Sequence, residues 1–393
     1  MYKIRCRNEF SFPLSVDSFA SRFNELKKND GRKKILYLKN EFDNSTFRYR
    51  CYNFKQSLEF SNKYCIVYFN SDEIRKIFSN LDNVSLVVLQ RASFNIDILN
   101  LVNYARKHKI CVVYDMDDLF YNVDHAISYI GHIGRRYDLD NVHLYIGYAM
   151  AHGLMAEKCD YFISTTKFLK NELENDYEKN GFVIPNFLNN EQIKESEFII
   201  NNRKEESDKF VIGYFSGSDS HRNDFRIIDN AILYLMEKYD NIYLKIVGFM
   251  ELDNRFNQYK DNGRLIFKEL VPYQELQYEI GEVDLNVVPL SENRFNKAKS
   301  ELKFFEAGIV KVPSCVSVNN VYDDIISDFE NGVLCAACEW KNKIEKLYLD
   351  RDLLKKIGEN AYETVNSKYI PKFWTKSIEK TYDEILSNYD SLR

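Results

Sequence analysis

Residues 211–248, VIGYFSGSDSHRNDFRIIDNAILYLMEKYDNIYLKIVG, contain one complete strand–helix–strand unit. The apolar run Val211 to Phe215 predicts a strand, and Tyr243 to Gly248 predicts a second one. Between them, Asp224 to Lys238 carries apolar residues at the spacing of an amphipathic helix. Such alternation is typical of βαβ units, whose strands pair in a parallel sheet.

The same alternation extends along most of the chain from Lys34 onward. In the first half, strands are expected at Ile35 to Lys39, Tyr64 to Phe69, Ser85 to Gln90, Ile110 to Tyr114, Tyr161 to Ser164 and Phe182 to Ile184, and helices at Thr46 to Phe60, Asp72 to Ser79, Asn95 to His108 and Lys167 to Tyr177. In the second half, further strands are expected at Arg264 to Phe267, Leu285 to Pro289, Ser314 to Val318 and Gly332 to Cys335, and further helices at Tyr273 to Ile280, Glu301 to Ala307, Lys341 to Tyr348 and Arg351 to Ser367. The sequence therefore predicts an α/β chain with two doubly wound domains.

A length of 393 residues also favours two domains, because one domain usually holds about 100–200 residues. The stretch 189–208 is rich in Glu, Lys and Asn and is interpreted as the interdomain connection. The first domain is assigned to residues 1–188 and the second to residues 209–372. Ligands of open parallel sheets bind beyond the carboxyl ends of the strands, so the loops after the strands are the candidate site segments.

Charge and cysteine content argue against several classes of protein. The net charge of -5 supplies no overall field that would attract nucleic acid. The eight cysteines are scattered and fit a reducing cytoplasm, and the C-x-x-C at Cys335 and Cys338 lacks the second pair that a zinc site needs. No signal-like start and no run of about 18 apolar residues is present. A cytoplasmic protein without a nucleic-acid partner is expected.

Residues 299–308, KSELKFFEAG, are the most informative candidate site. Ser300 is expected to cap a helix that continues through Glu301 and Leu302, and Gly308 to end it. Lys299, Lys303 and Glu306 would share one face at the start of this helix. A diphosphate could sit at the helix N-terminus while Glu306 accepts hydrogen bonds from a ribose diol. The alternative is an ordinary solvent-facing stripe of Lys and Glu.

The loop after Val211 to Phe215 is a second candidate phosphate site. Gly217 and Ser218 are small and let backbone approach a ligand, while His221 and Arg222 add donors just before a helix. An ordinary strand-to-helix turn is the alternative.

Three carboxylates, Asp115, Asp117 and Asp118, follow the strand Ile110 to Tyr114. Such a cluster can hold Mg²⁺ or Mn²⁺ against a diphosphate, transfer protons, or bind sugar hydroxyls. Alternatively, Asp115 or Asp118 caps a following helix. The spacing of the residues His125, His132, His143 and His152 matches no metal-ligand template, which favours structural roles for them.

Taken together, these segments resemble the family 4 (group 1) glycosyltransferases of bacterial polysaccharide synthesis over nearly the whole chain beyond the first thirty residues. The resemblance rests on Thr46 to Arg50, Val88 to Arg91, Tyr114 to Phe120, Cys159 to Thr166, Val183 to Asn186 and Lys299 to Gly308. The family pattern is Glu, seven residues, Glu, and this chain has Ala298 where the first Glu would stand.

The resemblance implies a GT-B fold, in which two Rossmann-like domains face each other across a cleft and a final helix, Phe373 to Tyr389, packs back on the first domain. It implies retaining, metal-independent transfer from a nucleotide diphosphate-sugar to a glycan or lipid-linked glycan, with no further cofactor. A lipid-linked acceptor would bring the protein to the inner face of the cytoplasmic membrane.

Site assignments follow from the motifs and the resemblance together. Catalysis is assigned to Lys303, Asp115 and Asp118. Donor binding is assigned to Gly217, Ser218, His221, Arg222, Lys299, Ser300, Glu301, Leu302 and Glu306. Asp117, Arg48 and Arg50 are expected on the acceptor side, and no metal site is expected. Three rival hypotheses remain, namely a sugar-nucleotide epimerase, a non-catalytic nucleotide-binding partner of another transferase, and a metal-dependent enzyme built on Asp115 and Asp117.

Overall fold

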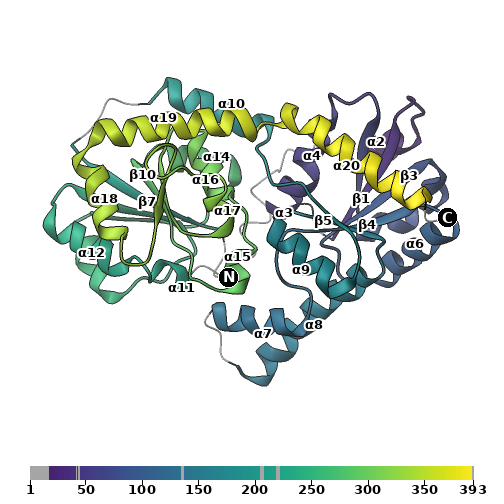
Figure 1. The fold of residues 1–393 in the computed structure, drawn as a ribbon, viewed down its shortest axis with the longest axis horizontal. Helices are drawn as coiled ribbons and strands as arrows, with labels where there is room; N and C mark the ends of the chain where they lie inside the picture. Colours follow the sequence, from purple (N-terminus) through teal and green to yellow (C-terminus); the bar gives the residue numbers. More distant parts are fainter. Residues whose placement is uncertain are drawn as a thin grey trace. The chain divides into compact units, whose positions relative to one another are not determined.

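A computed structural model describes residues 17–40, 42, 45–133, 137–203, 208–217 and 222–391, with only the backbone of Arg222 and Asn320. The chain divides into two compact units (Figure 1). Unit 1 comprises Met1–Ile127, Asp138–Asn189 and Pro371–Arg393, and unit 2 comprises Ser128–Tyr137 and Asn190–Ile370. No helix in the described ranges has both the length and the apolar character needed to cross a membrane.

Unit 1 is built on a parallel sheet with the strand order β2-β1-β3-β4-β5-β6. The strands are β1 (Lys33–Lys39), β2 (Tyr64–Asn70), β3 (Val84–Gln90), β4 (Cys111–Met116), β5 (Tyr161–Ser164) and β6 (Gly181–Val183). The helices are α2 (Phe19–Lys27), α3 (Ser45–Phe47), the π-helix η2 (Arg48–Tyr52), α4 (Asn53–Leu58), η3 (Ser71–Glu73), α5 (Ile74–Ile77), η4 (Phe78–Asn83), α6 (Ile96–Lys107), α8 (Leu139–Glu157), α9 (Lys167–Tyr177) and α20 (Pro371–Ser391). Helix α7 (Val123–His132) begins in unit 1 and ends in unit 2.

Unit 2 repeats this architecture with the order β12-β11-β10-β7-β8-β9, again with parallel pairs. Its strands are β7 (Phe210–Ser216), β8 (Ile242–Gly248), β9 (Leu265–Lys268), β10 (Leu285–Val288), β11 (Ser314–Ser317) and β12 (Val333–Cys335). Its helices are α10 (Asn190–Asn201), α11 (Arg222–Phe225), α12 (Asp229–Lys238), η6 (Asn254–Phe256), α13 (Asn257–Asp261), α14 (Tyr273–Gly281), α15 (Arg294–Lys297), α16 (Leu302–Gly308), α17 (Asn320–Asp323), α18 (Trp340–Leu349) and α19 (Arg351–Lys368).

Burial explains why the apolar runs form strands. Residues 35–38 of β1 are at most 1% exposed, so side chains on both faces of this strand are covered, as in sheets with helices on both sides. In unit 2, one continuous core joins β7 and β8 to α12 and α18. The expected α/β class is thereby confirmed.

The polar stretch 189–208 is more ordered than a connection alone would be, because α10 occupies Asn190–Asn201 and packs against α14. The last helix, α20, lies against α4 of unit 1 (Figure 1). There, the hydroxyls of Tyr37 and Tyr382 are 2.7 Å apart, and Ser57 Oγ donates to the Pro371 carbonyl at 2.8 Å.

Each sheet has one point where the direction of strand addition reverses, between β1 and β3 in unit 1 and between β7 and β10 in unit 2. Loops diverge at such a switch point and leave room for a ligand beyond the carboxyl ends of the strands.

Candidate active site

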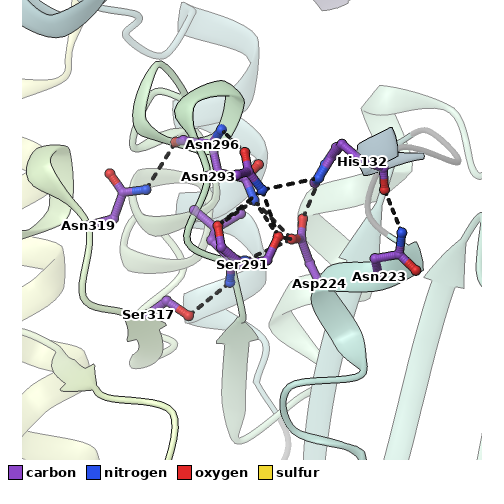
Figure 2. A network of polar contacts seen from close by, with 9 residues as sticks. His132, Asn223, Asp224, Ser291, Asn293, Asn296, Ser317 and Asn319 are labelled. Carbon is purple, nitrogen blue, oxygen red and sulfur yellow. Dashed lines mark hydrogen bonds and ion pairs between the residues drawn. The ribbon is translucent and has the colours of Figure 1, made fainter. Parts of the chain in front are cut away.

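In unit 2, a buried carboxylate ties together the loops on both sides of the switch point. Asp224, at the start of α11, is 0% exposed. Its Oδ1 accepts from Ser291 N at 2.8 Å, from Ser291 Oγ at 2.7 Å and from Asn296 Nδ2 at 2.9 Å. Figure 2 shows these side chains converging from α11, the loop after β10 and α15. Asp224 thus holds α11 next to the loop after β10.

The C-terminal end of α7 joins the same network. His132 is almost fully buried, and its Nε2 lies 3.8 Å from Asp224 Oδ2 (Figure 2). Its carbonyl accepts from Asn223 Nδ2 at 2.6 Å, and its Nδ1 is 3.3 Å from Asn293 Nδ2. The ring also packs on Phe295, with centroids 5.1 Å apart. This histidine therefore connects the end of α7 to α11 and to the start of α15.

Lys303 carries a buried ammonium group. Its Nζ is buried, lies 4.9 Å from the centroid of the Tyr214 ring, and has no hydrogen-bond partner among the described residues. Burial lowers the pKa of Lys303 to about 8, although the nearby carboxylates of Asp224 and Glu306 act in the opposite direction. The ammonium group is therefore attracted by two carboxylates without forming a hydrogen bond to either in the described chain.

The other members of the 299–308 segment take different positions. Glu306 is 5% exposed, and its carbonyl accepts from Gln277 at 3.1 Å. Glu301 is also buried, and Tyr369, whose pKa is raised mainly by burial, hydrogen-bonds to its carboxylate. Lys299 lies over the Phe295 ring at 4.2 Å from the centroid. Glu301 thus connects this segment to Tyr369 by a buried hydrogen bond, whereas Lys299, Lys303 and Glu306 lie near one another.

Both caps expected for this helix are wrong. Helix α16 begins at Leu302 with Glu301 as its N-cap, so Ser300 and Lys299 precede the helix. Gly308 lies within the helix, and Ile309 is the C-cap with right-handed backbone. A Cβ at position 308 would lie 2.7 Å from Val365 Cγ2 of α19, so close helix packing and not a turn requires glycine here.

The expected phosphate loop is described only in part. Ser218 and His221 lie outside the described residues, and the Arg222 side chain is not described. Gly217 is exposed, and a Cβ added to it would meet nothing within 4 Å. No described residue therefore fills the space beside Gly217.

In unit 1, Asp115 forms a buried ion pair with Arg50. Arg50 Nε donates to Asp115 Oδ1 at 2.9 Å and Nη2 to Oδ2 at 3.0 Å, and neither side chain is exposed. Arg50 Nη1 also donates to the Ile184 carbonyl at 2.6 Å. Burial raises the pKa of the Asp115 carboxyl, and the adjacent guanidinium opposes that shift. In this arrangement the pair connects the ends of β4 and β6 to η2.

Asp117 and Asp118 are partly exposed and face Arg91. Arg91 Nη1 lies 3.5 Å from Asp117 Oδ1 and 4.0 Å from Asp118 Oδ2. Burial alone would raise the pKa of Asp117, but the positive charges of Arg91, Lys39 and Arg50 outweigh it and lower that pKa. Neither Asp115 nor Asp118 caps α7, since Asn122 Oδ1 accepts from His125 N at its start.

Arg48 is buried in η2, its guanidinium carbon 4.8 Å from the centroid of the Tyr49 ring. Within the described ranges, no group of three or more His, Cys, Asp or Glu side chains is arranged to hold a metal ion.

Sequence patterns did not single out His132 and Asp224 as partners, nor Lys39, Gln90 and Arg91 as site residues. Their position in the sequence could have identified two of them, because Lys39 and Gln90 are the last residues of β1 and β3. A polar residue that ends a buried strand at a switch point is a candidate ligand-binding residue.

Comparisons with known proteins agree with this geometry. Residues 195–364 match the family "Glycosyl transferases group 1". The capsular polysaccharide biosynthesis glycosyltransferase CapM of Staphylococcus aureus is 22% identical over 243 residues, which span 57% of this chain and 61% of CapM. This chain therefore matches less than two thirds of that relative's length.

Solved structures share the fold at low sequence identity. Sucrose-phosphate synthase of Thermosynechococcus elongatus has a TM-score of 0.60 and 13% identity, covering 91% of this chain and 100% of that chain. Anabaena HepE in complex with UDP has a TM-score of 0.58 and 11% identity, covering 90% of this chain and 100% of that chain. Residues 195–364 of this chain are thus similar to the glycosyl transferases group 1, and the two parallel sheets of the chain have the GT-B fold of these solved structures.

Proposed function

We propose that this protein transfers a sugar from a nucleotide diphosphate-sugar to a glycan or lipid-linked glycan, and that unit 2 binds the donor. The observation that carries the proposal is the Lys303 ammonium group, buried and without a hydrogen-bond partner among the described residues. A buried charge is costly unless a counterion compensates it. A diphosphate beside the loop after β7 is such a counterion.

Lys303 would act when the bond between the sugar and the diphosphate breaks. The leaving diphosphate gains negative charge at that step, and a preorganised cation in a dry site stabilises that charge better than water does. With a pKa of about 8, most Lys303 side chains carry their proton at neutral pH. Gly217 would let the phosphates approach the backbone, and Glu306 would accept hydrogen bonds from the ribose.

Two further features of the proposal are retention of configuration, by family resemblance, and independence from metal. Support for the latter comes from the carboxylates of unit 1. Asp115 is engaged bidentately by Arg50, and Asp117 and Asp118 face Arg91. These guanidinium groups supply the positive charge that the carboxylates would otherwise draw from a divalent cation. Asp117 and Asp118 would then contact the acceptor.

Uridine nucleotides are the first donors to test, because HepE has been solved with UDP and with UDP-glucose. Thermal unfolding of wild type is measured with UDP, other nucleoside diphosphates and their sugars, with and without EDTA. A ligand that binds the folded state raises its melting temperature. We expect a shift that survives EDTA and weakens in Glu306→Ala.

Turnover tests the role of Lys303 directly. Lys303→Ala should lower kcat by about a hundredfold or more, the scale seen when one transition-state donor is removed. Near-normal turnover would refute the assignment. A nucleotide shift that EDTA abolishes would instead favour a metal site built on Asp115 and Asp117.

A second candidate is a non-catalytic nucleotide-binding partner of another transferase. It is favoured by Ala298, a fully buried methyl group at the position of the family's first Glu. Analysis of products from donor alone and from donor with lipid-linked glycans separates the candidates. Nucleotide binding without any sugar transfer to acceptor or water would favour the non-catalytic partner, and a changed sugar without acceptor would favour an epimerase.

A further inference from the structure

Unit 1 contains a second cluster of polar side chains, at its own switch point. Lys39 is the last residue of β1 and Gln90 the last residue of β3. Asp117 and Thr165 directly follow β4 and β5. Because β1, β3, β4 and β5 are neighbours in the sheet, these four residues stand side by side at its carboxyl edge. This is the edge at which open parallel sheets bind ligands.

The strongest indication of a ligand is Gln90. Its side chain is 0% exposed, and neither Nε2 nor Oε1 has a hydrogen-bond partner among the described residues. Thr165 Oγ1 is also buried and has no hydrogen-bond partner among the described residues. An enclosed amide that makes no hydrogen bonds destabilises a protein. Such a group is expected where a bound molecule supplies the missing donor and acceptor.

Lys39 adds a third polar group to the cluster. It is 6% exposed, and its ammonium group is attracted by the carboxylates of Asp117 and Asp115 and repelled by Arg91. Burial lowers the pKa of its ammonium group to about 8. Beside it, Arg91 is held in a left-handed backbone conformation with φ of 43°, which is strained for a residue with a Cβ. Strain of this kind is common at ligand sites.

The charges of the cluster indicate what kind of ligand it fits. Lys39, Arg50 and Arg91 are balanced by Asp115, Asp117 and Asp118, so the group has no net charge. A phosphate site would have an excess of cations. A balanced set of ammonium, amide, carboxylate and hydroxyl groups can donate to some hydroxyls of a ligand and accept from others.

We propose that Lys39, Gln90, Asp117 and Thr165 bind the uncharged hydroxyl groups of a sugar residue, the one that receives the transferred sugar. That this sugar is the acceptor rests on the proposed function, whereas the binding of an uncharged sugar by unit 1 does not. The Gln90 amide donates to one hydroxyl and accepts from a neighbouring one. Lys39 donates at the same edge, and Asp117 accepts.

The first test is the stability of Gln90→Leu in the full chain. Because Gln90 has no partner to lose, this variant should melt about 2–4 °C higher than wild type. Gln277→Leu is the matched control, since Gln277 is equally buried but donates to Ser196 Oγ at 3.0 Å and to the Glu306 carbonyl at 3.1 Å. It should melt lower. A Gln90→Leu variant that melts lower than wild type would show that Gln90 serves the fold, and would overturn the proposal.

The second test is saturation-transfer NMR with methyl α-D-glucopyranoside, methyl N-acetyl-α-D-glucosaminide and methyl α-D-galactopyranoside, and with glycerol 3-phosphate as an anionic probe. Wild type and Lys303→Ala should both give signal from a glycoside, and Gln90→Leu and Lys39→Met should lose it. No glycoside signal in wild type, unchanged signal in both unit 1 variants, or a Lys39-dependent signal from glycerol 3-phosphate alone would overturn the proposal. If no nucleotide binds, the proposed donor site in unit 2 is refuted, but the results with the glycosides still test the proposal for unit 1.

Discussion

Lys303 is a side chain whose role depends on holding one proton. Because its pKa is lowered to about 8, the cation is present below that pH and is lost above it. Affinity for a nucleoside diphosphate should therefore be constant up to about pH 8, and then fall by up to about tenfold for each pH unit. Calorimetric titration across pH 6–10 would measure this.

Lys303→Arg is the control, because a guanidinium stays charged throughout this range. The same fall in that variant would show that another group titrates. Stability of the free protein should follow the opposite trend. Since the folded-state pKa lies below the ordinary value of 10.5, the contribution of Lys303 to the free energy of unfolding rises as pH increases from about 8 to 10.5.

Gly217 allows a test in which ligand binding and folding are separated. A Cβ at this position meets no atom of the described residues within 4 Å, so Gly217→Ala should leave the melting temperature of the free protein within about 1 °C of wild type. If phosphate approaches the backbone there, the added methyl should weaken nucleotide binding about tenfold. Unchanged affinity would place the diphosphate elsewhere.

At the scale of elements, the packing of α16 on α19 positions Lys303 and Glu306. Gly308→Ala would bring a methyl 2.7 Å from Val365 Cγ2 and 3.2 Å from the Ala361 carbonyl. Overpacking of this kind should lower the free energy of unfolding by about 1–3 kcal/mol, measured by urea denaturation. Adding Val365→Ala should restore part of the loss if the methyl contact causes it. A double variant that is merely the sum of the two single losses would contradict this explanation.

The strands were predicted from the sequence better than the helices were, for a physical reason. Most of the strands, though not β6 and β9, are short apolar runs buried on both faces, and each expected strand overlaps an observed one. Helix α8 was not predicted, because residues 141–156 carry no Lys, Arg, Asp or Glu and so show no polar stripe. Helix α10 was missed for the opposite reason, since only a few of its side chains are buried and the stretch looked like a polar linker.

At the scale of the whole molecule, the Arg50–Asp115 pair joins segments of unit 1 that are distant in the sequence. Asp115→Asn would leave the guanidinium buried without its counter-charge and should cost about 3–5 kcal/mol of stability. Asp118→Asn is the control, because Asp118 is 16% exposed and lies 4.0 Å from Arg91, and it should cost less than about 1 kcal/mol.

Hydrogen exchange would localise the effect of Asp115→Asn. Amides of β1 and β4 should exchange faster, whereas those of β7 and β8, which belong to the other unit, should keep their wild-type protection. Equal losses of stability in Asp115→Asn and Asp118→Asn would mean that the buried pair contributes no more than a surface contact does.

The amino-acid sequence by itself determined the α/β class, the approximate places of the strands, and the candidate segments after β4, β7 and β10. These properties follow from local periodicity, which each segment carries regardless of its neighbours. Only the tertiary structure decided which buried polar groups have hydrogen-bond partners. Asp115 is paired with Arg50, 65 residues away, while Lys303 and Gln90 are buried without partners among the described residues. Compensation depends on which side chains the fold brings within hydrogen-bond distance, and no local pattern encodes that.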